Sequence, residues 1–134
     1  MTRESMEYDV VVVGGGPSGL AAAIKFKQLC IKNNKDFSIC VVEKGSQIGA
    51  HTLSGAVLET RALDELIPDW KLKDSPIKTK VTNEKFMYLT ETGAIKIPTI
   101  FLPKVMHNRD NYIISLGNLN IWLAKQAEEL GVEI

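Results

Sequence analysis

The sequence predicts an α/β fold in which a βαβ unit forms the start of a parallel sheet. Residues 8–13 are an apolar, β-branched run without alternation, as expected of a strand covered on both faces. A helix is expected from Pro17, and a second β-prone run occupies residues 37–42. The apolar positions of that helix are Leu20, Ala23, Ile24 and Ile31. Such a crossover is almost always right-handed, so the two strands are expected to run parallel.

The composition is that of an ordinary globular domain. A chain of 134 residues can bury a sizeable core but is short for a two-domain enzyme. Sixteen basic residues balance sixteen acidic ones, so no nucleic-acid partner is expected. No apolar run approaches the roughly 18 residues that span a bilayer. The polar N-terminus predicts neither a signal nor a transit peptide, and hence a bacterial cytoplasmic chain.

The two cysteines argue against a metal site in this chain. Cys30 and Cys40 are too few for a structural zinc site or an iron–sulfur cluster, which usually need four ligands. Both are expected to be reduced, buried packing residues. His51 and His107 lie in separate loops and do not suggest a metal site either.

The middle of the chain, residues 44–111, is irregular and contains four of the five prolines. A short helix is expected over residues 57–67, because its apolar residues share one face. That face comprises Leu58, Ala62, Leu63, Leu66 and Ile67. Residues 85–90 and 94–102 predict a β-hairpin with its turn at residues 91–93.

A strand-like segment, "NYIISL", then leads into a helix that is expected to end at Gly131. Its buried stripe is expected to comprise Leu119, Trp122, Leu123, Ala127 and Leu130. The final "VEI" resembles the start of a third parallel strand, so the sequence is expected to be truncated. The expected division is a nucleotide-binding domain of residues 1–50 and 112–134, with an inserted segment of residues 51–111.

The glycine-rich turn after the first strand satisfies the pattern G-x-G-x-x-G at Gly14, Gly16 and Gly19. Gly14 permits a tight turn, Gly16 leaves room for a pyrophosphate, and Gly19 allows the helix to pack close to the strand. Pro17 and Ser18 begin the helix, whose free amides favour an anion. The strand–turn–helix context predicts a Rossmann-like dinucleotide-binding domain rather than a turn without a ligand.

An acidic residue, Glu43, follows the second strand, with Lys44 beside it. Glu43 is expected to accept hydrogen bonds from an adenosine ribose, and its charge disfavours the 2′-phosphate of NADP. The fingerprint alone allows NAD or FAD. The long insertion before the third strand favours FAD, because it is typical of flavoproteins with interleaved domains.

Four stretches resemble the N-terminal part of the electron transfer flavoprotein–ubiquinone oxidoreductase family. They read "VVVVGGGPSGLAAAIKFKQL", "VVEKGSQIGAHTLSGAVLE", "LIPDWK" and "NYIISLGNLNIWLAKQAEELGVEI". The resemblance implies an enzyme that carries FAD and one [4Fe–4S] cluster and passes electrons from reduced electron transfer flavoprotein to ubiquinone. It also implies peripheral association with the inner membrane, on the cytoplasmic face in bacteria. The cluster cysteines would lie in a C-terminal part that this chain lacks, so the chain alone is not expected to be active.

The resemblance also assigns residues to the cofactor. It places the loop residues His51, Thr52, Leu53, Ser54 and Gly55 toward the flavin. The segment of residues 50–71 is similar to a part associated with the membrane surface. Relatives generally have arginine where Ser115 stands, which puts one contact with FAD in doubt.

Several alternatives remain open from the sequence. His51 is a weak candidate for an acid–base role, with a wall of the cofactor site as the simpler interpretation. Trp70 suits either a membrane interface or the core. The apolar residues between 95 and 102 suit either a lipid- or quinone-facing edge or an ordinary strand. Other functions to be weighed are a related flavin reductase or monooxygenase acting on an isoprenoid or aromatic substrate, and a non-catalytic nucleotide-binding module.

Overall fold

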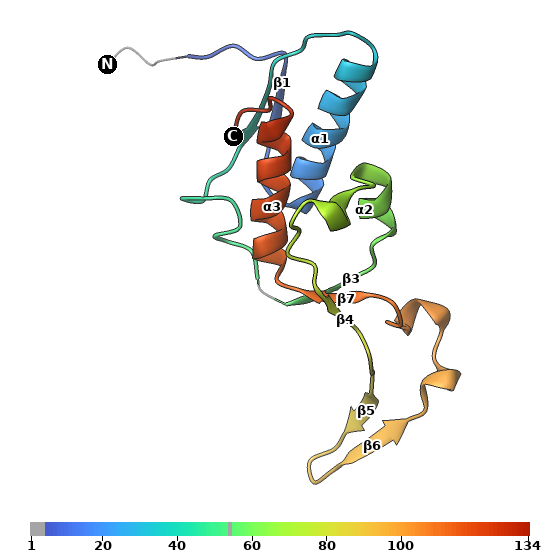
Figure 1. The fold of residues 1–134 in the computed structure, drawn as a ribbon. Coiled ribbons are helices and arrows are strands. Elements are labelled where there is room, and N and C mark those ends of the chain that lie inside the picture. The colour runs from blue at the N-terminus through green and yellow to red at the C-terminus, as the bar shows by residue number, and fades with distance from the viewer. Residues whose placement is uncertain (1–4, 54) are drawn as a thin grey trace.

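The computed structural model describes residues 5–53 and 55–134 (Figure 1). The helices are α1 (Pro17–Lys32), α2 (Arg61–Leu66) and α3 (Leu116–Glu129). Three 3₁₀ turns are η1 (Trp70–Leu72), η2 (Thr99–Phe101) and η3 (Lys104–Met106). The strands are β1 (Val10–Val13), β2 (Ile39–Val42), β3 (Ala56–Leu58), β4 (Thr79–Lys80), β5 (Phe86–Leu89), β6 (Ala94–Ile97) and β7 (Tyr112–Ile114).

The predicted βαβ unit is confirmed. Strands β1 and β2 are parallel, in a register that runs from Val10 opposite Ile39 to Val13 opposite Val42. The expected third parallel strand is represented by a single bridge, in which Glu133 pairs in parallel with Cys40. Its amide donates to the Ile39 carbonyl at 2.9 Å, and its carbonyl accepts from the Val41 amide at 2.8 Å.

One face of this sheet packs against α1 and α3, which lie side by side (Figure 1). Alternate strand residues, among them Ile39 and Val41, point into that core. The opposite face remains exposed, with Val13 86% accessible. On α1 the last buried apolar residue is Cys30, whereas Ile31, which was expected on the buried face, is exposed. Cys40 is only half-buried, since its side chain lies on the open face.

A small antiparallel sheet follows, in which β7 lies between β3 and β4. The expected helix over residues 57–67 therefore begins later, at Arg61, because Ala56–Leu58 pairs with β7 instead. Leu58 lies on β3, not on the helix as predicted. Long-range strand pairing has overridden a helical pattern of apolar residues.

The predicted β-hairpin is confirmed as β5 and β6, which pair from Phe86 opposite Ile97 to Leu89 opposite Ala94. It extends away from the helices (Figure 1). The second strand ends at Ile97 and not at Leu102, because Pro98 lacks the amide that a ladder needs, and η2 follows.

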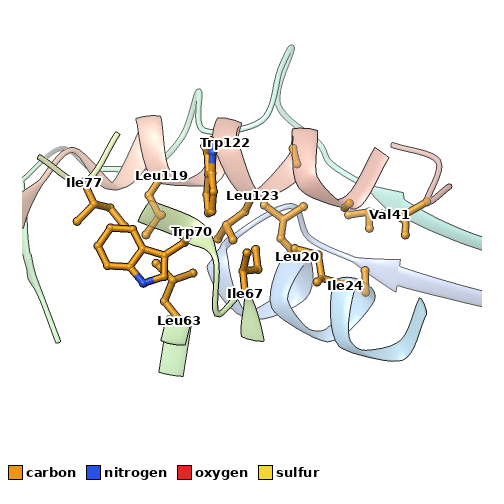
Figure 2. Close-up of a cluster of buried hydrophobic side chains, with 14 of the residues drawn as sticks. Leu20, Ile24, Val41, Leu63, Ile67, Trp70, Ile77, Leu119, Trp122 and Leu123 are labelled. Carbon is orange, nitrogen blue, oxygen red and sulfur yellow. The ribbon is translucent and has the colours of Figure 1, made fainter. Parts of the chain in front are cut away.

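The core joins all three helices to η1 (Figure 2). Trp70 is 1% exposed, its ring meets Tyr112 edge-on at 5.8 Å, and its Nε1 donates to Asp64 Oδ1 at 2.6 Å. A membrane-interface role for Trp70 is therefore wrong, and the core interpretation is confirmed. Trp122 is also buried, as predicted, and donates to the Lys73 carbonyl at 2.9 Å.

Candidate functional site

The glycine turn joins β1 to α1 in the conformation that its sequence predicts. Gly14 has a φ of +110°, which a residue with a Cβ rarely adopts, and its amide donates to the Val42 carbonyl at 2.8 Å. A Cβ built on Gly19 would lie 2.1 Å from the Gly14 carbonyl oxygen, so only glycine allows this close packing of helix against turn. A Cβ on Gly16 would meet no atom within 4 Å. The backbone at Gly16 thus borders open space.

The N-terminus of α1 faces that space without a capping side chain. Gly16 is the N-cap residue and Pro17 opens the first turn, which contains no acidic residue. Ser18 is exposed in the same turn. The first amides of a helix lack partners within the helix, and the helix dipole adds positive potential there. An anion such as a pyrophosphate fits this combination of open backbone and free amides.

The Glu43 carboxylate accepts hydrogen bonds from the backbone of the glycine turn and from the backbone of the loop that follows β2. Its Oε1 accepts from the Gly45 amide at 2.8 Å, and its Oε2 accepts from the Gly15 amide at 2.9 Å. These amides, Gly45 first and then Gly15, hold the pKa of the Glu43 carboxyl below its ordinary value of 4.5. Each carboxylate oxygen has a second lone pair, and Glu43 is half-buried. The group can therefore hold the turn and still accept two hydroxyl hydrogen bonds.

Substituting glutamine for Glu43 is expected to lower the melting temperature at neutral pH, because one amide donor would then face the new NH₂ group. The lowered pKa means that the carboxylate stabilises the fold fully above pH 4.5, and that this contribution is lost as the pH falls through the folded-state pKa. The difference between wild type and variant in thermal melts should therefore shrink under acid. The same substitution at the exposed Glu59 is the control. A difference that persists unchanged at low pH would contradict this role.

The loop after β2 lies between the glycine turn and α3. Ile48 covers Gly15, because a Cβ on Gly15 would lie 2.2 Å from Ile48 Cδ1. Gly49 has a φ of +84°, and a Cβ there would lie 2.9 Å from the Gly117 carbonyl oxygen at the start of α3. The loop is thus clamped between two backbone segments.

The predicted loop residues lie at different depths. Lys44, His51, Leu53 and Gly55 are exposed, and Thr52 is half-buried. His51 is close to the Glu43 turn, since its Nδ1 lies 3.5 Å from the position of a Cβ on Gly45. Ser54 lies outside the described residues. His51 therefore lies near Glu43, the residue predicted to accept hydrogen bonds from the ribose.

Asn120 on α3 lies next to this loop and was not predicted from the sequence. It is 0% exposed, and its Nδ2 donates to Thr52 Oγ1 at 3.0 Å. A polar residue between the apolar Leu119 and Ile121 is its only signal in the sequence. Ser115 caps α3 by accepting from the Asn118 amide at 3.4 Å.

The second histidine lies elsewhere, at the base of the hairpin. His107 Nδ1 is 3.6 Å from Glu84 Oε1, and its Nε2 is 3.2 Å from the Leu102 carbonyl. Within residues 5–53 and 55–134, no three His, Cys, Asp or Glu side chains are grouped so that they could hold a metal ion. Nor does this part of the chain include a helix with the length and apolar character to traverse a membrane.

Comparison with known proteins supports the predicted fold. Residues 12–69 match the family model of the NAD(P)-binding Rossmann-like domain. A variant of 2-methyl-3-hydroxypyridine-5-carboxylic acid oxygenase has a similar crystal structure, with a TM-score of 0.58 at 28% identity over 96% of this chain and 31% of that one. The chain thus has the Rossmann-like dinucleotide-binding fold that its sequence predicts.

Curated relatives align with nearly the whole chain. The chain is 58% identical to electron transfer flavoprotein-ubiquinone oxidoreductase of Pseudomonas aeruginosa, over 100% of its own length. It is 56% identical to the mitochondrial protein of the same name from Dictyostelium discoideum, over 98% of its length. It spans 24% and 21% of these two relatives. Over that segment, the chain is a homologue of electron transfer flavoprotein-ubiquinone oxidoreductase.

Proposed function

We propose that this chain forms the part of an FAD-dependent oxidoreductase that binds the adenosine diphosphate half of FAD. The complete polypeptide would pass electrons from reduced electron transfer flavoprotein to ubiquinone. The observation that carries the proposal is the open, uncapped glycine turn with Glu43 beside it, in a chain 58% identical to such an oxidoreductase.

The residues of the turn would divide the binding of FAD between them. Amides of the first turn of α1, at Ser18 and Gly19, would donate to the pyrophosphate, and Gly16 provides the clearance. Glu43 would accept from the ribose hydroxyls with its remaining lone pairs. The same carboxylate would repel the 2′-phosphate of NADP. Bound FAD supplies the redox chemistry, while the protein supplies orientation and electrostatics.

The loop beyond Glu43 would line the site toward the flavin, through His51, Thr52, Leu53, Ser54 and Gly55. Small residues leave clearance for a flat ring system. His51 is exposed and near Glu43, which supports a place in the wall of the site over an acid–base role. We assign residues 1–50 and 112–134 to the FAD domain and residues 51–111 to the flavin-lining, quinone- and membrane-side segment.

The [4Fe–4S] cluster belongs, in this proposal, to the polypeptide beyond Ile134. Cys30 is buried in the core and Cys40 lies on the sheet, so they do not provide a four-cysteine site. The full-length sequence tests this directly, because a continuation without cluster cysteines would favour the flavin reductase or monooxygenase alternative.

FAD binding is tested on the full-length polypeptide, purified without added cofactor. A flavin absorption spectrum and stoichiometric FAD release on denaturation are expected. A colourless protein that also fails to bind added FAD would refute the proposal. A protein that binds FAD but is not reduced by electron transfer flavoprotein would support the alternative of a non-catalytic nucleotide-binding module.

The hairpin and the turns after it carry several exposed apolar side chains. Ile100 is 82% exposed and Phe101 78% exposed. Other exposed apolar residues of this surface are Met87, Tyr88, Leu89, Ile95 and Val105. Exposed Lys85, Lys96 and Lys104 lie among them and suit anionic headgroups. We propose that this surface, together with parts of the chain beyond residue 134, rests on the inner membrane, on its cytoplasmic face in bacteria.

Substituting glutamate for both Ile100 and Phe101 is expected to reduce binding to anionic phospholipid vesicles at least tenfold, because two apolar contacts are replaced by charges that the lipid repels. Vesicle co-sedimentation of the full-length polypeptide measures the effect. Glutamate at Ile31, which is also exposed but lies at the far end of α1, is the control. Equal losses in both variants would contradict a specific role of the hairpin surface.

A further inference from the structure

A buried amide on α3 holds the loop that lines the proposed FAD site. Asn120 has no solvent exposure, and it reaches Thr52 across 68 positions in the sequence. Its Oδ1 has no hydrogen-bond partner among the described residues. A buried unpaired acceptor destabilises the fold, so a purely structural position favours an apolar side chain here. The asparagine therefore calls for a reason beyond packing.

The loop meets α3 at Thr52 and also where Gly49 closely approaches Gly117. Between them, the Thr52 amide donates to the Gly49 carbonyl at 3.1 Å, which closes a turn. At its other end the loop is held to the glycine turn through Ile48, which covers Gly15, and through Glu43, which accepts from the Gly15 amide. Asn120 thus fixes the segment that continues from the proposed ribose site.

The direction of the Asn120–Thr52 hydrogen bond has a chemical consequence. The Thr52 hydroxyl accepts from Asn120 Nδ2, so its own proton is free to be donated elsewhere. Thr52 is half-buried, so part of this residue is exposed to solvent. A ligand with an oxygen or nitrogen acceptor beside the loop would meet an oriented donor.

We propose that Asn120 is a positioning residue of the FAD site, which holds the loop of residues 44–53 and orients the Thr52 hydroxyl as a donor to bound FAD. This inference rests on the proposed function. Asn120 acts through Thr52 and does not itself contact the cofactor.

The experiment measures FAD affinity and thermal stability separately, on full-length apoprotein titrated with FAD. Asn120→Leu is expected to weaken FAD binding about tenfold, or about 1.4 kcal/mol. Its melting temperature without FAD should stay equal or rise, because an unpaired buried amide is replaced by an apolar side chain of similar volume. A merely structural residue would lower stability and affinity together. That outcome would overturn the proposal.

Thr52→Val removes the same hydrogen bond from the accessible side and tests the proposal even if the α3 variant folds poorly. Its loss of affinity should equal that of Asn120→Leu, and the double variant should lose no more than either, because both act through one hydroxyl. Thr52→Ser should retain wild-type affinity. Losses that add in the double variant, or a Thr52→Val variant with wild-type affinity, would overturn the proposal.

Gln126→Leu is the matched control. Gln126 is buried on the same helix, its Oε1 also lacks a partner among the described residues, and its Nε2 donates to Glu129 away from the loop. Its FAD affinity should remain that of wild type, and a loss equal to that of Asn120→Leu would overturn the proposal. A wild-type protein that binds no FAD would instead refute the proposed function itself.

Discussion

Replacing Gly16 with alanine is expected to weaken FAD binding about 100-fold, or about 2.7 kcal/mol, without changing the stability of the apoprotein. The backbone at Gly16 has a φ of −78°, which alanine adopts without strain, and the new Cβ would meet no protein atom within 4 Å. The added methyl group would instead occupy the space proposed for the pyrophosphate. It would separate the phosphate oxygens from the helix amides, and a single charge-assisted hydrogen bond contributes about 1.5–3 kcal/mol.

Gly19→Ala provides the contrasting variant in the same motif. Its Cβ would fall 2.1 Å from the Gly14 carbonyl oxygen and 3.2 Å from Val12 Cγ1, so the helix must move from the strand. The melting temperature of the apoprotein should fall, with a destabilisation of about 1–3 kcal/mol. Isothermal titration with FAD and thermal melts of both apoproteins separate the two effects. A Gly16→Ala variant that binds FAD normally would show that the open space is not the pyrophosphate site.

The parts of the fold that could be predicted are those specified by local pattern. The run of valines at residues 10–13, the three glycines of the turn and the helical stripe around Trp122 each constrain a short stretch of backbone directly. Gly131 illustrates this well, because its φ of +86° just after α3 is the conformation expected of a glycine at a helix end. Such features need no knowledge of distant partners.

The features that were missed depend on partners far along the chain. Residues 56–58 are helical by pattern, but their pairing with β7 makes them a strand. The double role of Glu43 as a cap for the Gly15 and Gly45 amides arises only when the loop folds back onto the turn. Asn120 is marked in the sequence only by the apolar residues on either side of it, and its partner Thr52 lies 68 positions away. Spacing alone carries no information about such contacts.

The sequence around Trp70 is compatible with a membrane-interface anchor and with a core residue. Proline and aspartate before it suit a surface anchor as well as a turn into the core. The structure places its ring against Leu63, Ile77 and Leu119 (Figure 2). The core of α1 and α3 thus extends into residues 61–77.

Truncating Trp70 to alanine is therefore expected to cost about 3–5 kcal/mol of stability. The variant would lose a fully buried ring, its edge-on contact with Tyr112 and its hydrogen bond to Asp64. Urea unfolding of the full-length polypeptide, with the midpoint compared at constant slope, measures the loss.

Trp70→Phe separates packing from the hydrogen bond. It should retain most of the stability, because the aromatic ring stays, but it should also lose a pH-dependent part. The hydrogen bond from Trp70 holds the pKa of Asp64 below its ordinary value of 3.8. Its contribution is complete above that pH and is lost as the pH falls through the folded-state pKa, so wild type and Trp70→Phe should converge in acid. Alanine at the neighbouring Leu72, which is 88% exposed, should change neither measurement. If Trp70→Ala changed the stability as little as alanine at Leu72 does, the buried ring of Trp70 would not be an essential part of the core.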